Sequence, residues 1–99
     1  MSQTSIISFK VSGKVQGVFF RKYTKAKGDE LGLKGWCQNT TDRNSVIGEA
    51  SGTTEKVETF KQFLRVKGSP KSRIDRAEFK KLTAMEKYTS EMSGFVIVR

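Results

Sequence analysis

The first segment of the chain alternates apolar and polar residues. Ile7, Phe9 and Val11 are each separated by one polar residue. This period of two predicts a strand that buries one of its faces. Gly13 interrupts the alternation, so we expect the strand to end there.

A helical pattern follows from Phe20 to Leu31. Phe20, Tyr23 and Ala26 recur at intervals of three residues, which places them on one face of a helix. Gly32 stands where a glycine commonly ends a helix. We therefore expect a helix over 20–31 with these three side chains on its inner face.

The next two segments predict a hairpin. Lys34–Thr40 and Val46–Ser51 have the composition of strands, and the polar cluster Thr41–Ser45 between them is typical of a turn. Gly52–Glu55 then predicts a helix start, because a threonine hydroxyl can cap it and an acid lies near its positive end. The apolar stripe of this helix consists of Val57, Phe60, Phe63 and Leu64, and the helix is expected to close at Gly68 and Pro70.

Two further strands complete the pattern. They are Ile74–Leu82 and Phe95–Val98, separated by a polar loop from Thr83 to Ser93. The order β-α-β-β-α-β with an additional terminal strand predicts an α+β, ferredoxin-like split βαβ fold, an antiparallel sheet with two helices on one face. Because 99 residues suffice for one core and not for two, we expect a single domain over 1–99.

The composition favours anionic partners. Lys and Arg number 19 against 10 Asp and Glu, for a net charge of +9. Such an excess suits nucleic acid, acidic membrane surfaces or phosphorylated small molecules, and equally a solvated basic surface. No apolar run approaches the ~20 residues of a membrane helix, and the first residues do not resemble a signal peptide. Cys37 is alone, so we expect a cytoplasmic protein without a disulfide.

The segment from Gly13 to Arg21 carries the candidate chemistry. Gly13 and Gly17 allow a tight turn between the first strand and the first helix, where backbone N–H groups can face an anion. Arg21 can offer two parallel donors to phosphate oxygens. The spacing alone equally describes a turn followed by a helix with a surface arginine. Asn39, on the next strand, could hold a water molecule through its amide or could simply end the strand.

Two runs carry a family resemblance: 13–24 (GKVQGVFFRKYT) and 31–40 (LGLKGWCQNT) resemble the acylphosphatase signature. The segments 68–75 and 94–98 also resemble that family, so the likeness spans nearly the whole chain. It implies hydrolysis of small acyl phosphates to a carboxylate and inorganic phosphate, by a monomer without metal or cofactor that binds neither nucleic acid nor membranes. By position, Arg21 would bind the phosphate and Asn39 would position the attacking water. The backbone donors would come from Gln16, Gly17, Val18, Phe19 and Phe20.

The hairpin turn departs from the family pattern. Thr41–Ser45 is one residue longer than usual, and Asn44 replaces a common glycine, although asparagine tolerates the left-handed conformation. Cys37 replaces a more usual aliphatic residue and should pack as a small apolar group. Trp36 is expected in the core or in a loop wall, Phe19 and Phe20 are expected to pack, and Arg73 and Asp75 are expected to form a local ion pair or face solvent.

Two rival functions remain to be weighed. An RNA-recognition domain shares the order of elements, but the strand Val46–Ser51 contains no aromatic residue for base stacking and carries Glu49. A cysteine-dependent phosphatase shares the spacing of Cys37 and Arg43, but the interval lacks glycine and runs into a hairpin turn rather than a helix. The chain contains no histidine, so we expect direct attack by water, without a phosphoenzyme, on a bond that is already activated.

Overall fold

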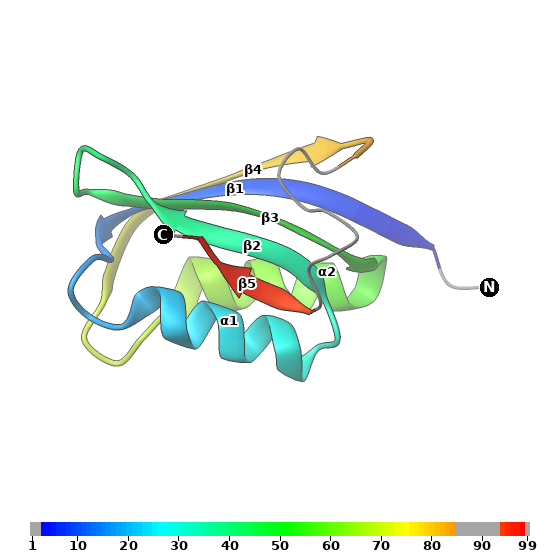
Figure 1. The fold of residues 1–99 in the computed structure, drawn as a ribbon, viewed down its shortest axis with the longest axis horizontal. Coiled ribbons are helices and arrows are strands. Elements are labelled where there is room, and N and C mark those ends of the chain that lie inside the picture. The colour runs from blue at the N-terminus through cyan, green and yellow to red at the C-terminus, as the bar shows by residue number, and fades with distance from the viewer. Residues whose placement is uncertain (1–2, 85–93, 99) are drawn as a thin grey trace.

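The computed structural model describes residues 3–84 and 94–98 (Figure 1). Its elements are β1 (Thr4–Lys14), α1 (Phe20–Glu30), β2 (Lys34–Asn39), β3 (Ser45–Thr53), α2 (Thr54–Gln62), the π-helical turn η1 (Phe63–Lys67), β4 (Arg73–Leu82) and β5 (Phe95–Ile97). The expected order is confirmed. The expected loop from Thr83 to Ser93 lies largely outside the described residues. None of the helices in 3–84 and 94–98 has the length and apolar composition of a membrane-spanning helix.

The strands form one sheet in the order β4-β1-β3-β2-β5. β1 pairs antiparallel with β3 and β4, and β2 pairs antiparallel with β3. The last strand differs from the expectation, because β5 runs parallel to β2 and makes the sheet mixed. Three apolar residues do not encode a pairing direction, which depends on the sheet edge that the chain reaches.

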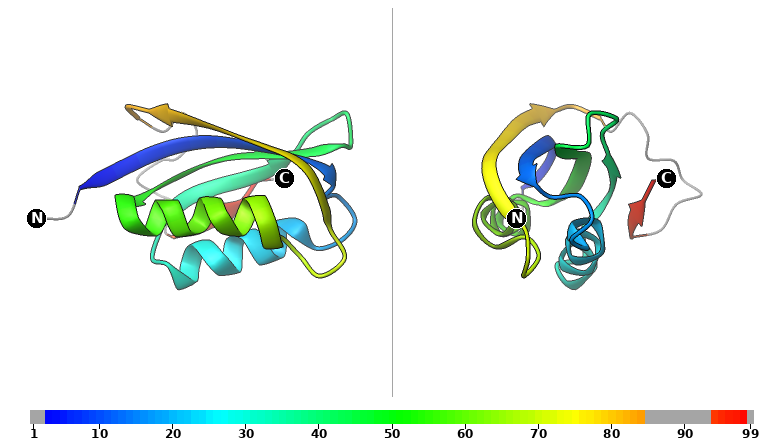
Figure 2. Two further views of the ribbon diagram at one scale, coloured as in Figure 1. Left: turned by 180° about the vertical axis from the view of Figure 1, so that it is seen from behind. Right: turned by 90° about the vertical axis from the view of Figure 1, so that its left-hand side faces the viewer.

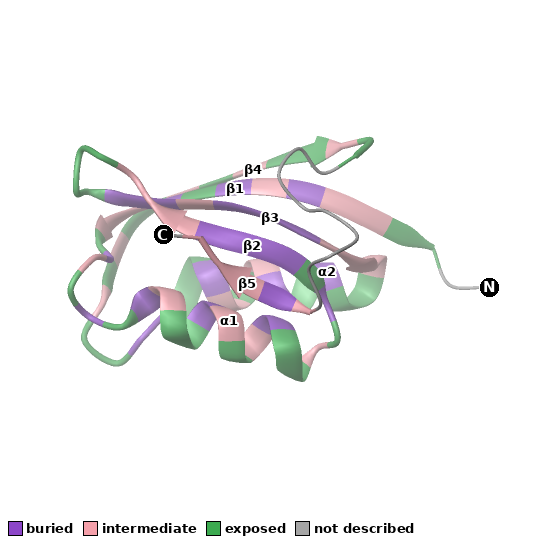
Figure 3. Ribbon diagram, viewed as in Figure 1, coloured by how far each residue is buried: buried purple, intermediate pink, exposed green. Residues whose placement is uncertain are grey.

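Both helices cover the same face of the sheet, as Figure 2 shows. The core lies between this face and the helices, where Figure 3 shows the buried residues of the strands and helices. Phe60 of α2 lies at its centre, with its ring centroid 5.8 Å from that of Phe9 and 5.4 Å from that of Phe95. The alternation that predicted β1 is confirmed, because Ile7, Phe9 and Val11 all belong to this core.

The inner face of α1 matches the prediction only at Phe20, which is buried. The other buried residues are Thr24 and Gly28, while Tyr23 and Ala26 are exposed. The side chain of Thr24 can be buried because its hydroxyl donates to the carbonyl of Phe20 at 2.8 Å. Gly28 is buried because a β-carbon there would lie 2.5 Å from the ring of Phe95. The helix therefore packs through small residues that apolar periodicity does not mark.

The start and end of α2 follow the prediction. The Thr53 hydroxyl accepts a hydrogen bond from the amide of Lys56 at 3.4 Å, and Glu55 lies in the first turn. The helical segment closes at Gly68, which has a φ of 57°. Val57, Phe60 and Leu64 are fully buried and Phe63 packs against them from a half-buried position.

Candidate functional site

The segment between β1 and α1 turns on two glycines with positive φ. Gly13 has a φ of 133°, and a β-carbon there would lie 2.2 Å from the carbonyl oxygen of Arg73 in β4. Gly17 has a φ of 74°, a left-handed conformation that glycine adopts without steric cost. Gly13 therefore allows close approach to β4, and Gly17 allows the turn itself.

Helix α1 begins without a side-chain capping hydrogen bond and without an acid in its first turn. The N-cap residue, Phe19, has a left-handed backbone with φ 62° and ψ 22°. The first helical hydrogen bond runs from the amide of Tyr23 to the carbonyl of Phe19, at 3.1 Å. The amides of Phe20, Arg21 and Lys22 precede it and have no acceptor within the helix. They lie at the positive end of the helix dipole, where an anion is stabilised.

A cavity of about 430 Å³, the α1 cavity, opens at this helix start. Its lining comes from the loop, from the first turn of α1, from the end of β2 and from β5: Val15, Gln16, Gly17, Phe19, Phe20, Arg21, Lys22, Asn39 and Ile97. Six of the seven predicted site residues thus share one cavity. Val18 is outside the lining and belongs to the core. Val15 and Ile97 form apolar walls to which the sequence analysis assigned no role.

The two phenylalanines of the loop have opposite environments. The side chain of Phe20 is buried in the core, as expected, and only 1% of this residue is exposed. Phe19 is 72% exposed, so the expectation that it packs is wrong. The left-handed backbone at Phe19 directs the two neighbouring side chains to different sides of the helix start.

Arg21 is partly buried at the cavity and forms no ion pair with any residue in 3–84 or 94–98. Other cations are neutralised nearby on the surface. Lys25 pairs with Asp29 at 2.6 Å, and Arg73 pairs with Asp75 at 2.9 Å, which confirms the expected local pair. The guanidinium of Arg21 is therefore available to an external anion.

Asn39 ends β2 on the side of the sheet that faces α1. It is two residues beyond Cys37, whose side chain lies in the core beneath that helix, and alternate residues of a strand share a face. The Oδ1 atom of Asn39 is buried and has no hydrogen-bond partner within the described ranges. A buried acceptor without a donor costs about 1–3 kcal/mol, so this atom marks a place for a polar ligand or water.

Cys37 and Arg43 do not form a cysteine-phosphatase site. Cys37 is fully buried, and its Sγ lies 3.9 Å from the carbonyl oxygen of Arg21. Burial raises the pKa of the Cys37 thiol to about 12, although the charges of Arg21 and Lys25 offset part of the effect. Arg43 is exposed on the hairpin turn. A nucleophilic thiolate would need the opposite environment, exposed and electropositive.

The loop is joined to the β2–β3 hairpin through Gln16. Its side-chain Nε2 donates to the carbonyl of Thr40 at 3.0 Å and to the carbonyl of Ser45 at 2.8 Å. The amide of Gly13 donates to the carbonyl of Asn44 at 2.9 Å. These bonds fix the loop beside the strand end that carries Asn39. From the sequence, only the backbone amide of Gln16 is expected at the site. The two bonds of its side chain are not foreseen.

The hairpin turn closes differently from the expectation. The left-handed residue is Arg43, with a φ of 65°, and not Asn44. The carboxylate of Asp42 accepts hydrogen bonds from the hydroxyl of Thr40 and from the amide of Asn44. Asp42 thus stabilises a turn in which the residue with positive φ comes one position earlier than the expected Asn44.

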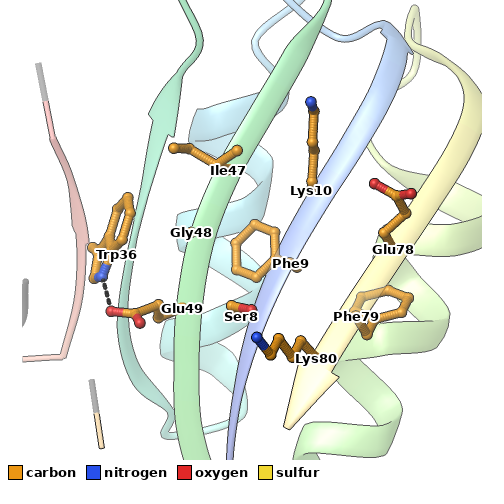
Figure 4. A pocket seen from close by; sticks show the side chains of 10 residues that line it. All are labelled: Ser8, Phe9, Lys10, Trp36, Ile47, Gly48, Glu49, Glu78, Phe79 and Lys80. Carbon is orange, nitrogen blue, oxygen red and sulfur yellow. Dashed lines mark hydrogen bonds between the residues drawn. The ribbon is translucent and has the colours of Figure 1, made fainter. Parts of the chain in front are cut away.

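A second cavity, of about 360 Å³, lies on the helix-free face of the sheet (Figure 4). Trp36 lines it and is buried there, donating from Nε1 to Glu49 at 2.7 Å. Two acids, Glu49 and Glu78, and two lysines, Lys10 and Lys80, contribute to the lining. The opposite charges are balanced, and the lining contains no helix start, so this cavity lacks the set of free donors found at the α1 cavity.

No group of three or more Asp, Glu or Cys side chains in 3–84 and 94–98 is arranged to hold a metal ion. The polar groups at the α1 cavity are amide, guanidinium and ammonium groups, which suit an anion.

Comparison with known proteins gives a consistent result. Residues 7–97 match the sequence model of the family described as Acylphosphatase. The chain is 51% identical to Acylphosphatase-1 of Xenopus tropicalis over 94% of its length and 92% of that protein. It is 46% identical to Acylphosphatase-1 of Homo sapiens over 94% of its length and 91% of that protein. The solved acylphosphatase of Bacillus subtilis superposes with a TM-score of 0.84 at 27% identity, over 96% of this chain and 99% of that one.

Proposed function

Because the chain belongs to the acylphosphatase family, and its activity is the hydrolysis of acyl phosphates, we propose that Arg21 binds the phosphoryl group and that Asn39 positions the attacking water. One observation carries the proposal. The uncapped start of α1, Arg21 and Asn39 line one cavity. Among the described residues, Arg21 has no ion-pair partner and the buried Oδ1 of Asn39 has no hydrogen-bond partner. Together they offer donors for an anion and an acceptor for a water beside it.

The phosphoryl oxygens would be held by the backbone amides of the 16–20 loop and by Arg21. Gly17 lets this loop turn, and the first turn of α1 supplies amides that have no acceptor of their own. The positive helix end adds a fixed dipole. Arg21 adds two parallel donors with a full charge. Lys22, which also lines the cavity, raises the positive potential at its mouth.

Asn39 would orient the nucleophile. Its Oδ1 would accept a hydrogen bond from water, and its amide nitrogen would donate to the water or to a phosphoryl oxygen. An oriented water presents a lone pair to the phosphorus atom. Because Gln16 ties the loop to the hairpin, the water and the phosphoryl group would be held by two elements in fixed relation. Such positioning lowers the activation barrier, because the entropy cost of bringing water and substrate together is met when they bind.

The reaction needs little other equipment. The water oxygen forms a bond to phosphorus while the bond from phosphorus to the acyl oxygen breaks, and the bonding electron pair leaves with the carboxylate. A carboxylate leaves without being protonated, so no general acid is required. We propose that an oxygen of the substrate's own phosphate accepts the water proton. Stabilisation of the developing charge by an arginine contributes about 10³ to 10⁵ in rate in phosphoryl-transfer enzymes.

Two variants test the assigned roles with benzoyl phosphate as substrate and a chelator present. Arg21→Gln should lose turnover together with competitive inhibition by inorganic phosphate. Asn39→Ala should lose turnover by about 10²- to 10³-fold, the loss typical of a single preorganised hydrogen-bonding group, and should keep phosphate inhibition. Both should unfold cooperatively like the parent. Retained turnover in either folded variant would remove that residue from its role.

The route of attack is tested separately with ¹⁸O-labelled water. Direct attack on phosphorus places the label in inorganic phosphate and leaves the carboxylate unlabelled. Label in the carboxylate, or a phosphorylated protein trapped during turnover, would contradict the scheme.

A further inference from the structure

Phe19 is an aromatic residue whose ring does not pack in the core. The residue is 72% exposed and lies outside the core cluster. Its backbone is left-handed, with a φ of 62°. This conformation costs an L-residue energy and is rare for a bulky side chain. A glycine would adopt it freely, as Gly17 does two residues earlier.

The position of Phe19 relates it to the substrate. Phe19 lines the α1 cavity with Arg21 and Asn39, and the ammonium nitrogen of Lys22 lies 5.9 Å from the centre of its ring. The cavity holds about 430 Å³. A phosphoryl group has four heavy atoms and occupies on the order of 100 Å³, if each takes about the volume of a water molecule. Most of the cavity is therefore left for the rest of the substrate.

The acyl group has to occupy that remaining space. The donors of the loop and of α1 hold the phosphoryl end, so the acyl chain extends toward the rim, where Phe19 offers exposed apolar surface beside the walls of Val15 and Ile97. We propose that Phe19 is a specificity-determining residue that contacts the acyl group, and that it makes this acylphosphatase favour substrates with an aromatic acyl group over acetyl phosphate. This proposal rests on the phosphate site proposed above.

The test compares kcat/KM for benzoyl phosphate and for acetyl phosphate in the parent and in Phe19→Ala. The parent should favour benzoyl phosphate. A ring-to-ring contact is worth about 3- to 10-fold in rate, so the ratio of the two values should fall by that factor in Phe19→Ala. Phe19→Leu, which keeps an apolar side chain, should fall in between and also covers the case in which the alanine variant folds poorly.

Tyr23→Ala is the matched control. Tyr23 is a second exposed aromatic residue of α1, 42% exposed, and is not part of the cavity lining. Its replacement should leave the ratio unchanged. An unchanged ratio in both Phe19 variants, or an equal change in Tyr23→Ala, would overturn the proposal. Arg21→Gln distinguishes the proposed phosphate site from the proposed Phe19 contact. Loss of the phosphate site abolishes turnover of both substrates alike, whereas loss of the Phe19 contact changes only the ratio of their kcat/KM values.

Discussion

Replacing Gln16 by alanine tests whether the joint between the loop and the hairpin serves catalysis. The change removes two donations from Nε2, to the carbonyls of Thr40 and Ser45. Neither carbonyl is left without a donor. The amide of Arg43 still reaches Thr40 at 3.3 Å, and the amide of Thr40 still reaches Ser45 at 3.1 Å. The loss is thus the net value of two hydrogen bonds, about 1–3 kcal/mol in the free energy of unfolding.

The expected effect on activity is uneven. Asn39 directly precedes Thr40, so the freed hairpin should let its amide move relative to the loop. A misplacement of about 1 Å can cost on the order of 10²-fold in rate. We therefore expect kcat to fall by about 10- to 100-fold. Inhibition by inorganic phosphate should weaken less than kcat falls, because Arg21 and the first-turn amides remain fixed by α1 and only the loop amides gain freedom.

The assay measures kcat, KM and the inhibition constant of inorganic phosphate, with the free energy of unfolding from urea denaturation. Gln16→Glu is the near-isosteric partner. Its carboxylate cannot donate to the two carbonyls and adds a negative charge to the cavity lining, so it should lower stability, kcat and inhibition by phosphate more than alanine does. Gln62→Ala, on the exposed side of α2, is the matched control and should change neither activity nor stability by a measurable amount. If stability falls while kcat holds, Gln16 is only structural, and the reasoning about Asn39 is refuted.

Two further predictions concern packing and pH. Gly28→Ala should lower the free energy of unfolding in urea by about 1–3 kcal/mol, because the added β-carbon would lie 2.5 Å from the ring of Phe95. This clash outweighs the usual preference of helices for alanine. The control, Ala26→Gly at an exposed site, should cost only about 1 kcal/mol. Burial raises the pKa of the Cys37 thiol from 9.0 to about 12, so its contribution to stability is present below pH 9 and is lost as pH rises toward 12. Between pH 8 and 10.5 the parent should lose about 2 kcal/mol more than Cys37→Ala does, and equal losses would contradict the buried thiol.

Local periodicity was sufficient for most of the fold. Alternation marked β1, and the hydroxyl and acid at 53–55 marked the start of α2, because both signals arise from residues a few positions apart. The inner face of α1 was predicted correctly only at Phe20, since Thr24 and Gly28 are buried through a hydrogen bond and through the shape of Phe95. The bond of Thr24 satisfies a polar side chain that periodicity counts as exposed, and the contact of Gly28 depends on a residue far along the chain.

The same division applies to the candidate site. Arg21 and the loop glycines could be proposed from the sequence because the run 13–24 resembles the family signature, whereas their spacing alone equally describes a turn before a helix. The unpartnered Oδ1 of Asn39 and the two bonds of Gln16 could not, because each depends on the packing of α1 and the hairpin against each other. The exposure of Phe19 was missed for a related reason, since an aromatic residue in a helix start is usually packed.

The two helix starts of this chain provide an internal comparison for the proposed phosphate site. α2 satisfies its own first turn, with the Thr53 hydroxyl on one amide and Glu55 near the positive end. α1 has neither a cap nor an acid, and its first turn contributes Arg21 instead. An uncapped helix start is less stable by about 1 kcal/mol, and a bound anion would supply the acceptor that α1 lacks. The sequence shows the same contrast, with Thr53 and Glu55 at the start of α2 and Phe19 and Arg21 at the start of α1. This contrast supports the proposal that α1, and not α2, binds the phosphoryl group.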